Sequence, residues 1–175
     1  MGEETLTEVT LAILYREGRF LMQLRDDFPH IIYPGIWGFF GGHIEPGESA
    51  DVGVRRELQE ELGYVPPQLS LFYQQADETV RNQTVQHQTV QNQTVQHQTV
   101  KNQKVRRYFY HGELTVPIEK LTLNEGQDLA LCSISEVRAG QKYSDKLAEH
   151  RALGGPHQQA LLKFIDSGLM PSLEA

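Results

Sequence analysis

Cysteine and long apolar runs are scarce in this chain, and each scarcity excludes a class of protein. Cys132 is the single cysteine among 175 residues, so we expect neither an intrachain disulfide framework nor a cysteine-based metal site. No apolar run approaches the ~20 residues that cross a bilayer. The N-terminus, residues 1–5, is acidic and polar, unlike a signal peptide, and Leu6 stands where a myristoylation motif requires Ser or Thr. We therefore expect a soluble, cytoplasmic protein without a membrane partner.

Positive charge is also in deficit. The 16 Lys and Arg residues are outnumbered by 23 Asp and Glu residues, which gives a net charge of −7. A chain without a basic excess is a poor binder of a nucleic-acid backbone, so no nucleic-acid partner is expected. An acidic protein that acts on an anionic phosphate needs a metal ion as an adaptor. The length suits a single domain, residues 1–175, with one core, and leaves monomer and homodimer open.

One segment, residues 79–104, has a composition unlike the rest. It repeats the unit Thr-Val-x-(Asn/His)-Gln, beginning with Thr79-Val80-Arg81-Asn82-Gln83. A period of five fits neither a helix nor a strand. Removing four units leaves an ordinary hairpin, so we interpret the repeat as an expansion of a connection between two core strands, either partly disordered or an extended hairpin. An interaction arm, or metal capture by His87 and His97, remains an alternative.

The remaining pattern indicates mixed strands and two main helices. A helix is expected after Ser49, a plausible N-cap, and should end at Gly63, and a closing helix is expected over 156–165. A short helical turn is expected at 135–137. Strands are expected over 9–15, 19–25, 37–41, 69–75, 105–116 and 129–134. This order favours an α/β sandwich.

The expected helix after Ser49 carries three carboxylates at spacing i, i+3, i+4: Glu57, Glu60 and Glu61. At about 100° per residue they fall together on the flank beside the apolar stripe of Val54, Leu58 and Leu62. Like charges on adjacent turns repel one another unless a cation neutralises them. Oxygen-only ligands favour a hard cation, Mg²⁺ or Mn²⁺. A solvated acidic helix face is the alternative for this spacing alone.

The wider pattern removes that alternative. The stretch from Gly42 to Tyr64 matches G-x5-E-x7-R-E-U-x-E-E-x-G-U, where U is a bulky apolar residue or Tyr, at every fixed position. The probability of a chance match at a given start is on the order of 10⁻⁹ with ordinary residue frequencies. The stretch resembles the Nudix box of the Nudix hydrolases, and Trp37-Gly38-Phe39-Phe40-Gly41 resembles the lead-in strand of that family.

The resemblance implies a fold and a metal site. The fold would be a Nudix-type α-β-α sandwich around a mixed β-sheet, with the repeat inserted between two strands. The metal ligands would be Glu57, Glu60 and Glu61, with the Gly41 carbonyl as a further ligand. Glu48 at the helix start would lie near the metal or serve the helix dipole alone.

Other residues are expected to complete the chemistry. Arg56 would brace a carboxylate, Glu57 or Glu48, by a bidentate contact. Glu125 lies in a loop before a strand. The resemblance implies that it is a metal ligand or a base, and the alternative is a turn residue without a role in the chemistry. Among candidate substrate contacts, Arg25 would meet a phosphate and His43 lies in the catalytic turn. Phe39, like Trp37, would either stack on a base or lie in the core.

The function implied is Mg²⁺-dependent hydrolysis of the diphosphate link of a nucleoside diphosphate joined to another group. The small-molecule substrate would be a nucleoside triphosphate, ADP-ribose, a nucleotide sugar or a dinucleoside polyphosphate, and the compact chain favours a MutT-like nucleotide pyrophosphatase. An isomerase of this fold needs a cysteine ahead of the box, whereas Cys132 lies after it. A non-catalytic nucleotide sensor is the alternative, although such sensors usually lose the box carboxylates.

Overall fold

The computed structural model describes residues 5–29, 31, 33–90 and 93–170, and for residues 5 and 77–103 it describes the backbone alone. The strands are β1 Thr5–Arg16, β2 Arg19–Leu24, β3 Trp37–Gly38, β4 Phe40–His43, β5 Ser70–Val90, β6 Gln93–Glu113, β7 Asp128–Ser133, β8 Gln141–Ser144 and β9 Glu149–Ala152. The helices are α1 Ala50–Leu62, α2 Ile134–Ala139 and α3 Gly155–Asp166, with a 3₁₀ turn at Ile118–Lys120. No helix in these described ranges is long and apolar enough to cross a membrane.

The described strands β1 to β7 form one mixed sheet. Its main path runs β3-β2-β1-β6-β5, while β4 pairs with β1 and β7 pairs with β2. Strands β1 and β6 run parallel from Thr5 opposite Gln103 to Tyr15 opposite Glu113, and the other pairings in the sheet are antiparallel. A separate hairpin of β8 and β9 lies beside it.

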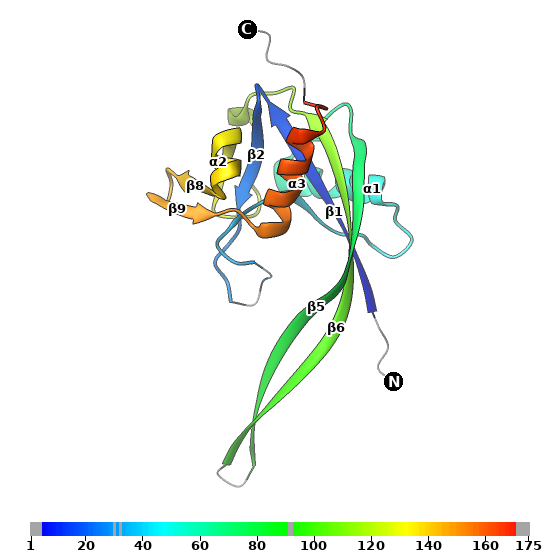
Figure 1. Ribbon diagram of the computed structural model, residues 1–175, viewed down its shortest axis with the longest axis vertical. Helices are drawn as coiled ribbons and strands as arrows, with labels where there is room; N and C mark the ends of the chain where they lie inside the picture. Colours follow the sequence, from blue (N-terminus) through cyan, green and yellow to red (C-terminus); the bar gives the residue numbers. More distant parts are fainter. Residues whose placement is uncertain (1–4, 30, 32, 91–92, 171–175) are drawn as a thin grey trace.

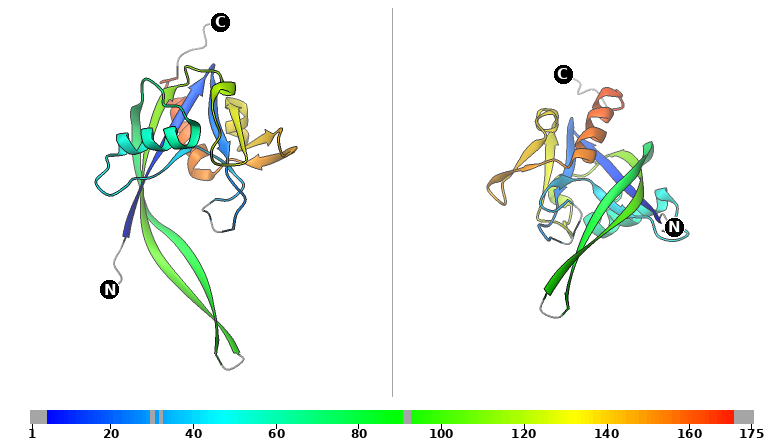
Figure 2. Two further views of the ribbon diagram at one scale, coloured as in Figure 1. Left: turned by 180° about the vertical axis from the view of Figure 1, so that it is seen from behind. Right: turned by 60° about the horizontal axis from the view of Figure 1, so that its bottom comes forward.

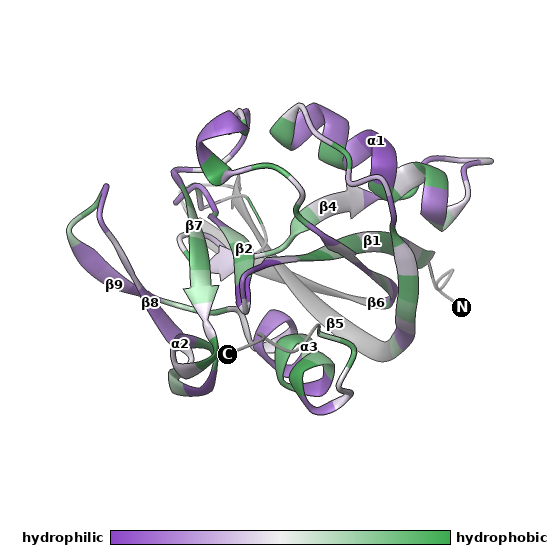
Figure 3. Ribbon diagram, turned by 90° about the horizontal axis from the view of Figure 1, so that it is seen from above, coloured by the Kyte–Doolittle hydropathy of each residue, from purple (hydrophilic) through white to green (hydrophobic). Residues whose placement is uncertain are grey.

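Helices cover the two faces of this sheet (Figures 1 and 3). On one face α1 buries Val54, Leu58 and Leu62 in an apolar cluster with residues of the sheet such as Phe40. On the other face α2 and α3 contribute to a second cluster, with Val137, Ala160, Leu161 and Phe164 packed around Phe20, Met22 and Trp37. The expected α-β-α sandwich around a mixed sheet is thereby confirmed.

The repeat extends two strands of the core and does not form a separate connection. The backbones of β5 and β6 pair from Val80 opposite Gln103 to Val90 opposite Gln93, so the two strands continue beyond the sheet as a hairpin. Figures 1 and 2 show this hairpin projecting from the sandwich. Of the two expected conformations, the structure has the extended hairpin. The side chains of His87 and His97, named above as possible metal ligands, lie outside the described residues.

Candidate active site

Helix α1 presents the candidate metal ligands because its two ends and its apolar stripe are fixed. Its N-terminus is capped by the Ser49 side chain, which accepts a hydrogen bond from the Val52 backbone N–H at 3.3 Å. Its C-terminus ends at Gly63 in the left-handed conformation, with φ of 62°. Since the apolar stripe lies on the sheet, the carboxylates beside it face strand β4.

Glycines in β4 allow the carboxylates of α1 to approach the strand backbone. The Gly41 N–H donates to Glu61 Oε2 at 2.7 Å. At Gly42, a Cβ atom would lie 2.6 Å from Oε1 of Glu57, closer than real Cβ atoms come to a neighbour. Gly41 has φ of 128°, and a Cβ there would overlap the Thr10 carbonyl. The two glycines therefore set the distance between the strand and the carboxylates.

Arg56 ties four acceptors together at the edge of this site. Its guanidinium makes a bidentate contact with Glu48 at 2.9 and 3.1 Å, as the sequence predicted. It also donates to Glu57 at 2.9 Å and to Glu60 at 3.2 Å. The backbone carbonyl of His43 accepts the remaining contact at 3.0 Å. Hydrogen bonds from Arg56 lower the pKa of Glu48, which keeps that carboxylate charged.

Glu61 is the most buried carboxylate of the group, at 5% exposure. Burial raises the pKa of Glu61 to about 8, against hydrogen bonds from the Gly41 N–H and the Gln23 amide, and the charges of Glu57 and Glu125 raise it further. Burial also raises the pKa of Glu57. Ionising both carboxylates would thus crowd negative charge in a poorly solvated place, which a cation would relieve.

The donor chemistry of this cluster fits a hard divalent cation. Every side-chain candidate offers carboxylate oxygens, the ligand type that Mg²⁺ and Mn²⁺ prefer. Within the described ranges no three His, Cys, Asp or Glu side chains stand close enough together to form a ready-made metal site. In this arrangement Glu57 and Glu60 both accept hydrogen bonds from Arg56.

Glu125 lies close to this cluster although it is distant in sequence. Asn124 ties its loop to the end of α1, by a backbone N–H bond to the Glu61 carbonyl at 2.9 Å and a side-chain bond to the Glu60 carbonyl at 2.7 Å. Glu125 lines a small cavity of about 100 Å³ together with Gln23 and Arg25. The loop thereby brings a further carboxylate close to those of α1.

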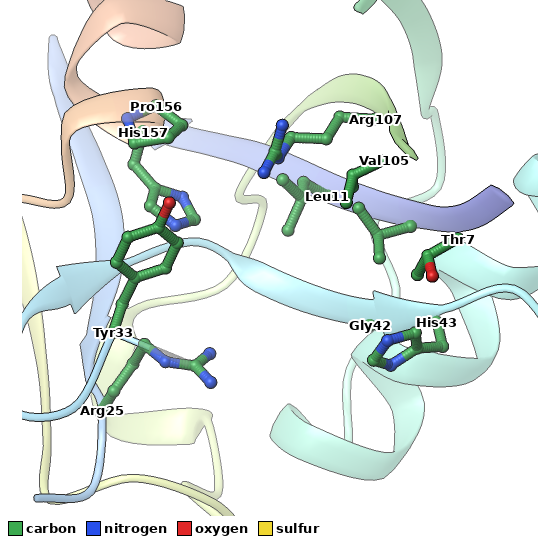
Figure 4. Close-up of a pocket in the computed structure, with 11 residues that line it drawn as sticks. Thr7, Leu11, Arg25, Tyr33, Gly42, His43, Val105, Arg107, Pro156 and His157 are labelled. Carbon is green, nitrogen blue, oxygen red and sulfur yellow. The ribbon is translucent and has the colours of Figure 1, made fainter. Parts of the chain in front are cut away.

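A larger cavity of about 210 Å³ opens on the other side of β4 (Figure 4). Strands β1, β4 and β6, the loop after β2 and the start of α3 supply its lining. The lining residues are Thr7, Val9, Leu11, Arg25, Tyr33, Gly42, His43, Val105, Arg107, Pro156 and His157. Because Gly42 borders both this cavity and Glu57, a bound ligand would reach from the cavity to the carboxylates.

The cavity includes two of the three expected substrate contacts. Arg25 and His43 line it, and Figure 4 shows the side chains of Arg25, just after β2, and Arg107, in β6, reaching toward it. The expectation that Phe39 stacks on a base is wrong for this conformation. Its ring is 1% exposed and packs edge-on against Phe109 and His157, in the apolar cluster on the α3 side of the sheet. Trp37 is likewise fully buried.

Sequence reasoning did not predict most of the cavity lining, and the aromatic and charged residues that it missed include Tyr33, Arg107 and His157. His157 has no neighbour at ligand spacing, and Tyr33 is in an irregular loop. Arg107 lies in an expected strand, but the sequence does not show which face of the sheet its side chain is on. The alternation of Val105, Arg107 and Phe109, all buried on one side of β6, was the available signal for Arg107.

Comparison with known proteins places the chain in a family. A family model described as NUDIX domain matches residues 5–151. The nucleoside triphosphatase NudI of Escherichia coli O1:K1 is 36% identical over 56 residues, which are 31% of this chain and 38% of that protein. The same values hold for NudI of E. coli O9:H4. The chain thus matches well under half the length of these curated relatives.

Solved structures share the fold at low identity. The MutT protein of Methanosarcina mazei Go1 has a TM-score of 0.60 at 16% identity, over 97% of this chain and 100% of that one. The E. coli dihydroneopterin triphosphate pyrophosphohydrolase has a TM-score of 0.59 at 17% identity, over 94% and 100%. The NUDIX domain of Shewanella oneidensis NrtR, in complex with ADP ribose, has a TM-score of 0.58 at 17% identity, over 95% and 90%. With the family model spanning most of its residues, the chain belongs to the Nudix family.

Proposed function

We propose that this protein is a Mg²⁺-dependent pyrophosphohydrolase that cleaves the diphosphate link of a nucleoside diphosphate joined to another group. One observation carries the proposal: the carboxylates around Arg56 lie next to a cavity that has apolar walls and two arginines, with Gly42 at the boundary. A base and sugar would occupy the cavity, and the phosphates would extend past Gly42 toward α1.

The carboxylates of α1 and the backbone of β4 would provide the metal site. Glu57, Glu60 and Glu61, with the Gly41 carbonyl and nearby Glu48, would hold Mg²⁺ or Mn²⁺. The ion would neutralise phosphate charge and acidify water.

The protein's own residues would orient the reactants. Arg56 positions Glu57 and Glu60 through its hydrogen bonds, and Arg25 supplies a guanidinium to a phosphate. Arg25 borders both cavities, and its Nε is buried without a partner among the described residues, so its N–H is placed to donate to an anionic oxygen. Glu125 would act as the base, since its charge acts on both Glu57 and Glu61.

The substrate is proposed to be a nucleoside triphosphate. NudI, the relative that shares 36% identity over its aligned part, is named a nucleoside triphosphatase. ADP-ribose and nucleotide sugars are the next candidates, since the NrtR domain of similar fold is described in complex with ADP ribose. A non-catalytic sensor would bind one of these nucleotides without turning it over.

The test measures release of phosphate and pyrophosphate from a nucleotide panel with Mg²⁺, Mn²⁺ or a chelator. We expect turnover with either metal and none with the chelator. Glu60→Gln should lower kcat by orders of magnitude, since it removes the charge of a proposed metal ligand. Its side chain is 60% exposed, so the substitution should change stability little. Glu125→Gln should lower kcat with little change in melting temperature.

The matched control is Asp51→Asn on the same helix. Asp51 pairs with Arg55 at 3.2 Å on the exposed face of α1, away from Arg56, so its loss should leave kcat unchanged. Nucleotide binding without any turnover would support the sensor and contradict the proposal. Full activity of Glu60→Gln would remove the carboxylate cluster from the mechanism.

A further inference from the structure

The ring of His157 has a fixed tautomer. His157 stands in the first turn of α3, and its Nδ1 accepts a hydrogen bond from the backbone N–H of Phe39 at 3.2 Å. A backbone N–H can only donate, so Nδ1 carries no proton and the neutral ring carries its proton on Nε2. Burial, with the nearby charges of Arg25 and Arg107, lowers the pKa of His157 to about 3, which keeps the ring neutral.

The ring is also held in place. His157 is 8% exposed, and its ring meets that of Phe39 edge-on at 4.9 Å between centroids. Gly154 leaves room for it, because a Cβ there would lie 2.7 Å from Cδ2 of His157. Within the described part of the chain Nε2 has no hydrogen-bond partner, and the ring lines the larger cavity (Figure 4). Nε2–H is therefore a rigid donor available to a ligand in that cavity.

The other polar side chains that line this cavity are dominated by donors. Arg25 and Arg107 carry only N–H donors, and Nε of Arg25 is buried without a partner in the described ranges. The hydroxyls of Thr7 and Tyr33 can donate or accept. Among the described residues no Asp, Glu, Asn or Gln side chain lines the cavity, so the hydroxyls of Thr7 and Tyr33 are the only acceptors that its lining Thr, Tyr, Arg and neutral His157 side chains offer to an amino group.

We propose that His157 determines base selectivity by donating from Nε2–H to a ring carbonyl oxygen, so that the protein prefers keto bases to amino bases. This rests on the proposed nucleotide hydrolysis and narrows its substrate to nucleotides of the uracil, thymine, guanine or hypoxanthine type. An amino group of cytosine or adenine at the same place would set donor against donor and leave both unpaired. Sites built around such a hydrogen bond discriminate strongly.

Matched substrate pairs test this with the wild-type protein. UTP and CTP differ at position 4, where a carbonyl replaces an amino group, and ITP and ATP differ in the same way at position 6. We expect kcat/KM to be about tenfold or more higher for UTP than for CTP and for ITP than for ATP. Equal values within each pair, or a preference for the amino member, would overturn the inference and leave the proposed function standing. Hydrolysis of no nucleotide would overturn both.

A variant then assigns the selectivity to His157. His157→Phe keeps a ring of similar shape and removes the donor, so both ratios should fall to within about threefold of one, through loss of activity on UTP and ITP. His150→Phe, at an exposed histidine of β9 outside the cavity, is the control and should keep the wild-type ratios. Unchanged ratios in folded His157→Phe would remove His157 from base selection. If this variant fails to fold, the wild-type ratios decide.

Discussion

Adjacent glutamates on α1 have different surroundings and should contribute differently. Glu60 is mostly exposed, and its contact with Arg56 at 3.2 Å is one that a cation would have to replace or share. Glu61 is buried and accepts hydrogen bonds from Gly41 and Gln23. Glu60→Gln therefore isolates the charge, whereas Glu61→Gln also changes the contact that joins α1 to β4. A lower kcat in a Glu61 variant must therefore be compared with its melting temperature, to separate loss of charge from loss of stability.

The buried neutral histidine gives a prediction on stability and pH. The pKa of His157 is about 3 in the fold and near 6.5 when unfolded, so protonation favours the unfolded chain. Above pH 6.5 the histidine is neutral in both states, so it does not change the free energy of unfolding. As the pH drops from 6.5 toward 3, the unfolded chain gains a proton that the fold does not, and stability falls. The charged groups facing it, Arg25 and Arg107, act in the same direction.

Urea unfolding at pH 7 and pH 5 would measure this. Relative to His157→Phe, the wild-type free energy of unfolding should fall by about 2 kcal/mol more between these pH values, at about 1.4 kcal/mol per pH unit below 6.5. The comparison cancels the other titrating groups, and the Phe39 N–H left unpaired in the variant shifts stability at both pH values alike. His150→Phe should keep the wild-type slope. A slope shared by all three proteins would mean that His157 is protonated in the fold.

At the scale of elements, the distance between β4 and α1 determines where the Glu57 carboxylate lies. Gly42→Ala keeps a backbone conformation that alanine accepts, but its methyl would lie 2.6 Å from Oε1 of Glu57. The end of a flexible side chain must then shift, so the melting temperature should change little. We expect kcat to fall about tenfold or more, and the Mg²⁺ concentration for half-maximal activity to rise.

The control for this spacing is Gly155→Ala at the start of α3, where a Cβ meets nothing within 4 Å. It should retain wild-type kcat and metal dependence. Wild-type metal dependence in Gly42→Ala would show that the position of Glu57 tolerates displacement, and the assignment of Glu57 as a ligand would be weakened.

Elements with local signals could be predicted from the sequence, and those without could not. Helix α1 follows from its period, its Ser49 cap and Gly63, all of which act within a few residues. Strands β8 and β9 were missed because they are polar and mostly exposed, without an alternating apolar pattern. The cavity was missed in part because it joins β1, β6 and α3, and spacing along one segment cannot show which faces meet.

At the scale of the whole molecule, only the base of the long β5–β6 hairpin pairs with the rest of the sheet. Strand β1 pairs with β6 from Gln103 onward, so nearly all of the repeat lies beyond the sheet. The cavity lining from β6 begins at Val105, and α1 and the Glu125 loop lie in other parts of the chain. The side chains of 77–103 lie outside the described residues, so the interpretation of 79–104 as an insertion within one domain remains a prediction to test.

Deleting Thr84 to Gln103 removes four whole units and tests it. The deletion keeps Asp77 and Val105, which pair across the hairpin base, and joins them through 78–83 and Lys104, a short turn-length connection. It removes one β1–β6 pair, Thr5 with Gln103, and leaves those from Leu6 to Tyr15. Shortening a connection changes its closure entropy by only about 0.6 kcal/mol per halving of length, so stability should change little. We expect the same metal dependence and pH profile and a kcat/KM within a few-fold of wild type. Loss of activity with a normal melting curve would make the hairpin part of the site, and unfolding would make it part of the core.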